Sequence, residues 1–169
     1  MDKATKGGYT AMKPIWILIL IALIAGIMFW SVGGSEITDE APYYIKKVIG
    51  ETATVTVKNT AINAEVARSD SARAKGLSGR SKLADGKGML FVFTEASVYP
   101  FTMKEMLFYI DIIWINDNKI AFMEQSAQPG VESITPDSSA VYVLEVRGGT
   151  AKRYGWQIGD PVIISFDKD

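Results

Sequence analysis

The sequence predicts a mostly β domain of the α+β class, either a compact β-sandwich or a partly closed barrel with two short helices, preceded by one N-terminal transmembrane helix. Three observations predict this fold. An apolar run without charges occupies residues 15–32. Short β-branched or alternating segments follow residue 50 and are separated by Gly, Pro, Asn and Asp, as in strands joined by turns. Two brief helical segments lie in the connections between them.

Residues 15–32 are predicted to cross a lipid bilayer as an uncleaved signal anchor. At about 1.5 Å per residue this helix spans about 27 Å, close to the ~30 Å hydrocarbon core. Trp16 and Trp30 lie near its two ends, where indole rings favour the interface. A cleaved signal peptide and a buried helix of a soluble protein are the alternatives. The first usually has a shorter apolar region, and the second is rarely apolar on all faces.

The charges on either side of the apolar run predict its orientation. Lys3, Lys6 and Lys13 precede it, and the first charges after it are acidic. The positive-inside rule then places the N-terminus in the cytoplasm. A Gly-Gly-Ser start and Pro42 mark a tether after the span. We therefore expect a single-pass cell-membrane protein with an extracytoplasmic part, residues 33–169. Its segments are a cytoplasmic tail (1–14), the anchor (15–32), the tether (33–50) and an exterior β domain (51–169).

The first half of the exterior domain is predicted to contain a hairpin, a short helix and a buried strand. Alternation of β-branched and small residues indicates the hairpin strands, and Ser69 or Asp70 is suited to cap the helix. Gly76 lies near the end of that helix. The expected elements are strands 52–57 and 61–67 around a turn at 58–59, helix 71–77, a polar loop 79–87 and strand 88–93.

The second half is predicted to hold the centre of the sheet. Residues 110–116 are apolar on both faces, which indicates a strand covered on both sides. Thr150 is a candidate cap for the second helix, and Gly155 is its expected end. The expected elements are strands 101–103 and 110–116, a turn at 117–118, a hairpin strand 119–124, a loop 126–139, strand 140–146, helix 151–154 and strand 161–166.

Composition excludes several classes of function. The chain has no cysteine, so it cannot form disulfides, thiolate nucleophiles or cysteine-ligated metal sites. It also has no histidine, the commonest general base at neutral pH and a frequent metal ligand. The net charge of −1 gives no field that would recruit nucleic acid. We therefore expect no nucleic-acid partner and no metal or other cofactor.

Lys104 and Asp111 are the first candidate site residues, because both interrupt a strongly apolar stretch, residues 101–116. Buried charges are costly unless they are paired or hydrogen-bonded. The two side chains are interpreted either as a pair on a cleft wall or as a structural ion pair. A serine–lysine dyad of Lys104 with Ser78 or Ser81 is a further possibility that needs no histidine.

Two arginines and a glutamate complete the candidate ligand-binding set. Arg73 and Arg80 flank a helix end, and guanidinium groups suit carboxylate or phosphate ligands. The alternative is that they tie loops to backbone carbonyls or to an acid such as Glu145. Carboxylates could also bind calcium, but no calcium-loop spacing is present. The candidate site residues are Arg73, Arg80, Lys104, Asp111 and Glu145.

Six motifs in order make the chain resemble the domain-of-unknown-function family 192, also called uncharacterised protein family 0127, over about residues 55–165. The resemblance implies a compact β-sandwich-like domain, often exported behind a signal or anchor, and no established activity. The motifs are Arg73-x-x-Gly76-Leu77-x-x-Arg80, Gly88-Met89-Leu90-Phe91-Val92-Phe93, Phe101-Thr102-Met103-Lys104, Ile110-Asp111-Ile112-Ile113-Trp114-Ile115, Tyr142-Val143-Leu144-Glu145-Val146 and Gly155-x-x-x-Gly159-Asp160.

Anchor, size and composition together favour a membrane-tethered extracytoplasmic module that binds a small ligand or serves as an envelope accessory. The expected partners are the lipid bilayer, through residues 15–32, and a small anionic ligand or an envelope component. One alternative is a histidine-free hydrolase of envelope material that uses Lys104 and Asp111 with a serine or water. The other is a purely structural or assembly protein.

Overall fold

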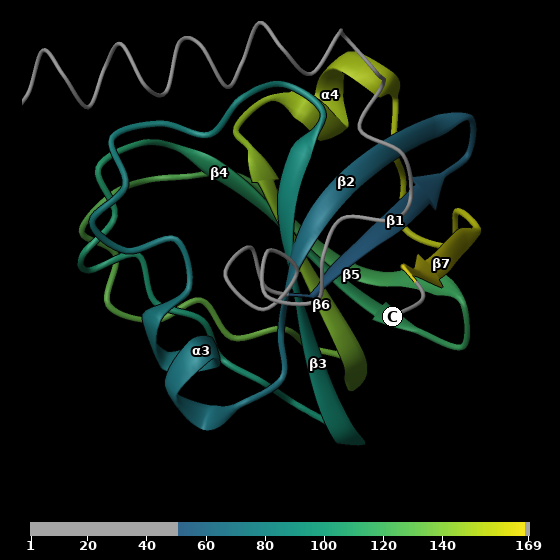
Figure 1. Cartoon of the computed structure of the whole chain (residues 1–169), viewed down its shortest axis with the longest axis horizontal. Coiled ribbons are helices and arrows are strands. Elements are labelled where there is room, and N and C mark those ends of the chain that lie inside the picture. Colours follow the sequence, from purple (N-terminus) through teal and green to yellow (C-terminus); the bar gives the residue numbers. More distant parts are fainter. Residues whose placement is uncertain (1–50, 168–169) are drawn as a thin grey trace, which may run out of the picture. The chain divides into compact units, whose positions relative to one another are not determined.

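The structure, a computed structural model, describes residues 51–167. The predicted tail, anchor and tether therefore lie outside the described residues. Within residues 51–167, no helix is long and apolar enough to cross a bilayer. The described residues form seven strands and two short helices (Figure 1). These elements are β1 (Thr52–Val57), β2 (Thr60–Ala67), α3 (Asp70–Lys75), β3 (Lys87–Ser97), β4 (Ile110–Asn116), β5 (Lys119–Ala127), β6 (Ala140–Arg147), α4 (Thr150–Tyr154) and β7 (Val162–Phe166).

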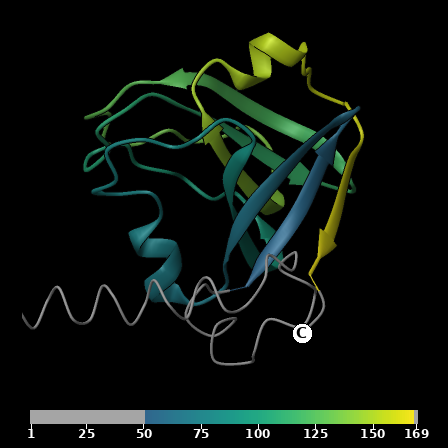
Figure 2. The same cartoon turned by 45° about the horizontal axis from the view of Figure 1, so that its top comes forward.

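All seven strands belong to one sheet in the order β5-β4-β6-β3-β2-β1-β7. The sheet curls so that its two ends approach each other at one corner (Figures 1 and 2). There, Lys119 at the start of β5 forms an isolated bridge with Pro161, next to β7. The Ile120 amide also donates a hydrogen bond to the Asp160 carbonyl over 3.0 Å. The fold is thus a half-barrel, the second of the two predicted architectures, and not a sandwich of two sheets.

The curled sheet packs a core on each face. The enclosed face carries the alternating small and branched residues of β1 and β2, which meet Ile113 and Ile115 of β4, and Trp156 after α4. The outer face carries Phe91 and Trp114 under loop residues such as Leu77 and Leu83. Because β4 lies between β5 and β6 and is covered on both faces, six of its seven residues are buried. The continuous apolar pattern of residues 110–116 is explained by this double coverage.

Most of the predicted elements are confirmed, with differences in the connections. Phe101 makes only an isolated bridge to Ile134, so residues 101–103 are not a strand. Ser69 caps α3 as predicted, and its side chain accepts a hydrogen bond from the Ala72 amide. The predicted Thr150 cap is wrong, because Gly149 occupies the N-cap position of α4. β2 and β3 pair in parallel through α3, so this part of the sheet is a crossover and not a series of hairpins.

Candidate functional site

Asp111 is buried and all of its hydrogen bonds go to backbone amides. Oδ1 accepts from Ser126 at 2.8 Å and from Gly149 at 3.0 Å, and Oδ2 accepts from Ala151 at 2.7 Å. Gly149 and Ala151 belong to the first turn of α4, whose amides have no partner within the helix. Asp111 therefore caps α4 from a distance and also holds the bulge in β5 at Ser126.

Lys104 lies apart from Asp111. Its side chain is exposed, in the connection between Phe101 and β4, whereas Asp111 is 0% exposed. Within residues 51–167, Lys104 forms no ion pair, and its amine forms no hydrogen bond with Ser78 or Ser81. The structure thus shows neither the predicted pair nor the serine–lysine dyad in a bonded arrangement.

Glu145 is a buried glutamate on the outer face of the sheet. It lies on β6 opposite Met89 of β3 and Ile112 of β4, so apolar side chains flank it on both neighbouring strands. The residue is 4% exposed, and its Oε2 has no partner among the described residues. Burial raises the pKa of Glu145 to about 8, and the nearby Arg80 guanidinium limits this rise. Glu145 therefore holds a proton at neutral pH.

Arg80 is hydrogen-bonded to a second carboxylate, Glu65, and acts electrostatically on Glu145. Its two terminal nitrogens donate to the two oxygens of Glu65 at 2.6 and 2.7 Å, a bidentate arrangement. These hydrogen bonds lower the pKa of Glu65, so this carboxylate is ionised while Glu145 is protonated. Of the five predicted site residues, the structure brings Arg80 and Glu145 within electrostatic reach of each other.

Arg73 serves α3 and the strand beside it. Its guanidinium donates to the carbonyls of Arg68 and, at 3.0 Å, Val92, and it pairs with Asp70 of its own helix. It also lies 5.2 Å from the centre of the Phe93 ring, a cation–π contact. Arg73 thus fits the structural alternative, in which the arginine ties a helix to backbone carbonyls.

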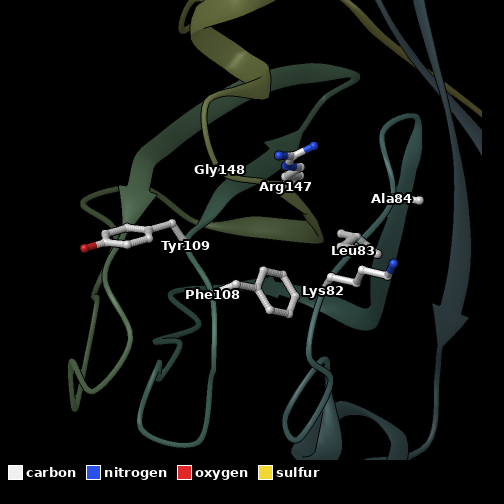
Figure 3. Close-up of a pocket in the computed structure, with 7 residues that line it drawn as sticks. All are labelled: Lys82, Leu83, Ala84, Phe108, Tyr109, Arg147 and Gly148. Atoms are coloured by element: carbon white, nitrogen blue, oxygen red, sulfur yellow. The ribbon is translucent and has the colours of Figure 1, made fainter.

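A cleft of about 590 Å³ lies on the outer face of the sheet, and none of the five predicted site residues lines it. Its walls come from the loop before β3, the residues before β4 and the end of β6 (Figure 3). The ring of Phe108 points toward Lys82 and Leu83, whereas the ring of Tyr109 points the other way (Figure 3). The lining residues are Lys82, Leu83, Ala84, Phe108, Tyr109, Arg147 and Gly148.

Gly148 lines the cleft where its backbone lies closely against Tyr109. A Cβ atom there would lie 2.9 Å from both Cβ and the carbonyl oxygen of Tyr109, closer than real contacts allow. The Gly148 amide donates to the same Tyr109 carbonyl over 2.9 Å. The missing side chain therefore lets the end of β6 lie against the residue that precedes β4.

Positive charge exceeds negative charge around the cleft. Arg147 donates to Asp85 at 2.9 Å, and Arg153 of α4 donates to the other oxygen of the same carboxylate at 3.2 Å. One carboxylate is thus shared by two guanidinium groups, which lower the pKa of Asp85. Lys82 adds a third cation to the same surface. An apolar wall with surplus cations at its rim is suited to an anion that also carries an apolar group.

Comparisons with known proteins agree with the sequence resemblance. The family model DUF192, described as an uncharacterized ACR, matches residues 53–164. The chain belongs to the DUF192 family. Among solved structures, a Sinorhizobium meliloti protein provisionally described as a transcription regulator is similar, with 30% identity and a TM-score of 0.62 over 67% of this chain and 92% of that chain. No match was found among curated proteins.

A second similar structure comes from Novosphingobium aromaticivorans and is described as a protein of unknown function. It has 27% identity and a TM-score of 0.61, over 78% of this chain and 99% of that chain. Two solved structures are therefore similar in fold to this DUF192 domain, and none of these descriptions establishes an activity for the family.

The DUF192 domain offers no clustered metal ligands in its described part, since residues 51–167 contain no group of three Asp or Glu placed to hold an ion. The residues that sequence reasoning missed are Glu65, Lys82, Phe108 and Arg147. Arg147 had a detectable signal: it follows Glu145 by two positions on a strand, so both point to the same face. Lys82 and Phe108 lie in irregular segments without such a pattern.

Proposed function

We propose that this protein is a membrane-tethered module that binds a small anionic ligand outside the cytoplasmic membrane. The anchor is residues 15–32, the N-terminus lies in the cytoplasm, and residues 33–169 are extracytoplasmic. The observation that carries the ligand proposal is the cleft, which combines an apolar wall with surplus cations. The localisation rests on the apolar run and the lysines that precede it.

The charges define the ligand class. Lys82, Arg147 and Arg153 are exposed cations, and Asp85, which pairs with the two arginines, is the carboxylate beside them, so two positive charges remain. An entering anion can bind Lys82 directly and can compete with Asp85 for Arg147. Leu83 and the Phe108 ring offer the apolar surface that a carboxylate or phosphate ester of small aromatic or aliphatic character would cover.

Other partners find less support. The net charge of −1 does not favour binding to nucleic acid. A role as a transcription regulator, which is described for the S. meliloti relative, therefore finds little support in this chain. Lys104 lacks a hydrogen-bonded nucleophile among residues 51–167, so no described contact favours the hydrolase. An envelope accessory role is compatible with ligand binding, because a tethered module can present its ligand to other envelope components.

Binding can be tested with benzenesulfonate, an aromatic anion whose charge is constant across neutral pH. The full-length chain in non-ionic detergent should bind it at least about tenfold more tightly than benzyltrimethylammonium, a cation of similar size. Titrations followed by amide chemical shifts would measure both affinities. A double variant, Lys82→Gln with Arg147→Gln, should weaken anion binding at least about tenfold. Lys119→Gln, an exposed lysine at the β4–β5 turn, is the matched control. Equal affinity in the double variant would overturn the proposal.

Topology can be tested in whole cells, because the chain has no native cysteine. Single-cysteine variants Thr10→Cys, in the predicted tail, and Ser71→Cys, on exposed α3, would be treated with a membrane-impermeant maleimide. We expect labelling of the Ser71→Cys variant in intact cells and of the Thr10→Cys variant only after lysis. The reverse pattern would refute the orientation, and labelling of both in intact cells would refute the anchor.

A further inference from the structure

Glu145 and the cleft are parts of one structural unit. Glu145 and Arg147 are two residues apart on β6, so their side chains leave the same face of the strand. Arg147 lines the cleft, whereas Glu145, two residues earlier on the same face of the strand, is buried. The unpartnered Oε2 of Glu145 thus belongs to the strand that supplies a cation of the proposed binding site.

The loop of residues 76–86 is a second link between Glu145 and the cleft, in addition to β6. Arg80 in this loop bonds to Glu65 and acts electrostatically on Glu145. Two residues later the same loop supplies Lys82 and Leu83 to the cleft, and then Asp85, which pairs with the arginines at the rim. The loop that positions Arg80 therefore also positions residues that line the cleft.

The charged groups around Glu145 are few. Its neighbours on β3 and β4 are Met89 and Ile112, which carry no charge. Glu65 on β2 and Glu124 on β5 lie one strand further out in the same cross-strand row. The cations are Arg80, from the loop, and Arg147, two residues along β6, and guanidinium groups stay charged throughout the neutral range. No histidine exists in the chain to titrate beside them.

From this geometry we infer that the cleft binds its anion in the state in which Glu145 is protonated, so that a chain with an ionised Glu145 takes up one proton as it binds. The inference rests on the proposed function and specifies how that site is regulated. The proton comes from solvent and sits on the Glu145 carboxyl, so no further reactant is needed. Anion affinity is then high while Glu145 is neutral and falls when it ionises.

Two physical effects act in the same direction. An ionised Glu145 places a negative charge in a poorly solvated position two residues from Arg147 on the same face of β6, and so disfavours an anion bound at Arg147. The same charge attracts Arg80 and competes with Glu65 for its guanidinium, which draws the loop of Lys82 and Leu83 away from its position at the cleft. A neutral Glu145 does neither, so the cleft stays as the structure shows it.

The test compares benzenesulfonate affinity of the full-length chain at about pH 6 and about pH 9.5. We expect the dissociation constant of the native chain to rise about tenfold or more over this range, since the two charges interact at short range. In Glu145→Gln, which cannot ionise, the constant should change less than about twofold. Glu124→Gln removes a carboxylate from the same row and should keep the full pH dependence.

Calorimetry in two buffers of different ionisation enthalpy provides a measurement that needs no variant. Near pH 8 the native chain should take up a fraction of a proton on binding, and no uptake would overturn the inference. Tight binding that is equally strong at both pH values would also overturn it, while the proposed function would stand. Absence of binding at both pH values would overturn the proposed function and the inference together.

Discussion

Asp111 and Glu145 are buried carboxylates on adjacent strands, but their oxygens have different surroundings. β4 and β6 pair so that Ile112 lies opposite Glu145, which puts Asp111 and Glu145 on opposite faces of the sheet. Asp111 accepts three backbone hydrogen bonds on the enclosed side, from the β5 bulge and from the start of α4. Glu145 faces the outer core with an oxygen that has no partner among the described residues.

The comparison teaches that burial alone does not define the role of a carboxylate. Three amide donors occupy most of the acceptor positions of the Asp111 carboxylate, so this side chain fixes the fold. Glu145 lacks donors, so burial keeps it protonated to about pH 8. Strong retention of a proton by an unsatisfied acid is typical of functional positions, whereas a saturated acid is typical of structural ones.

The largest effect is expected from Asp111→Ala. The substitution leaves the amides of Ser126, Gly149 and Ala151 without their acceptor, and each unsatisfied buried donor costs about 1–3 kcal/mol. We expect a loss of about 3–5 kcal/mol in the free energy of unfolding, measured by urea denaturation. Asp137→Ala, at an exposed aspartate, should change it by less than about 0.5 kcal/mol. A similarly small loss of stability for Asp111→Ala would contradict the structural role assigned to Asp111, and with it the difference between Asp111 and Glu145.

Glu145→Gln should raise the free energy of unfolding at high pH. The folded chain keeps the Glu145 proton up to about pH 8, whereas the unfolded chain releases it near the ordinary value of 4.5. Between these values the folded state binds more protons, so the free energy of unfolding falls as pH rises and remains low above about pH 8. Glu145→Gln removes this loss. The variant should be more stable than the native chain above pH 8, by roughly 3–5 kcal/mol.

Urea denaturation at several pH values would measure this difference, and Glu124→Gln would serve as its control. The native chain should lose stability across the window while Glu145→Gln stays flat. Since the chain has no histidine, few other groups titrate between pH 6 and 8 to obscure the result. A native chain whose stability is constant from pH 5 to 9 would show that Glu145 is solvated or paired.

Local patterns predicted most of the strands, because alternation and turn residues are local properties. β1 occupies Thr52–Val57 as expected, and the double burial of β4 was visible in its apolar run. The parallel pairing of β2 with β3 and the contact of Lys119 with Pro161 depend on chain segments far apart in sequence. A hydrophobic pattern does not specify such pairings, so the choice between sandwich and half-barrel stayed open.

The candidate site was predictable in part. Glu145 could be selected because an acid within an apolar strand needs an explanation, and Asp111 could be selected for the same reason. The two acids differ in their hydrogen bonds, and this difference depends on residues far away in the sequence. Gly149 and Ala151, which donate to Asp111, lie about 40 residues further along the chain. Lys104 and Asp111 were considered together because both interrupt one apolar stretch, but Lys104 is exposed in the irregular connection of residues 102–109, whereas Asp111 is buried in β4.

A smaller effect is expected from Arg80→Met. Arg80 lowers the pKa of Glu145, so its removal should raise that pKa and move the pH window of decreasing stability upward. The lost pair with Glu65 is partly exposed and should cost no more than about 1 kcal/mol at neutral pH. Carbonyl-region infrared spectra of the Glu145 carboxyl, collected against pH, would measure the shift. An unchanged or lowered pKa would show that Arg80 does not act on Glu145.

The smallest effect should come from Arg68→Met. This variant removes a bidentate arginine–glutamate pair that resembles Arg80–Glu65 but does not act on Glu145. Arg68 donates two hydrogen bonds to Glu51, of 2.7 and 2.8 Å, in the same bidentate arrangement as Arg80 with Glu65. It also lies 4.5 Å from the centre of the Phe166 ring. Because this pair is partly exposed and Arg68 does not act on Glu145, its loss should cost less than about 1 kcal/mol and leave the titration of Glu145 unmoved. A shift of that titration as large as in Arg80→Met would mean that general charge, and not the neighbouring guanidinium, sets the protonation of Glu145.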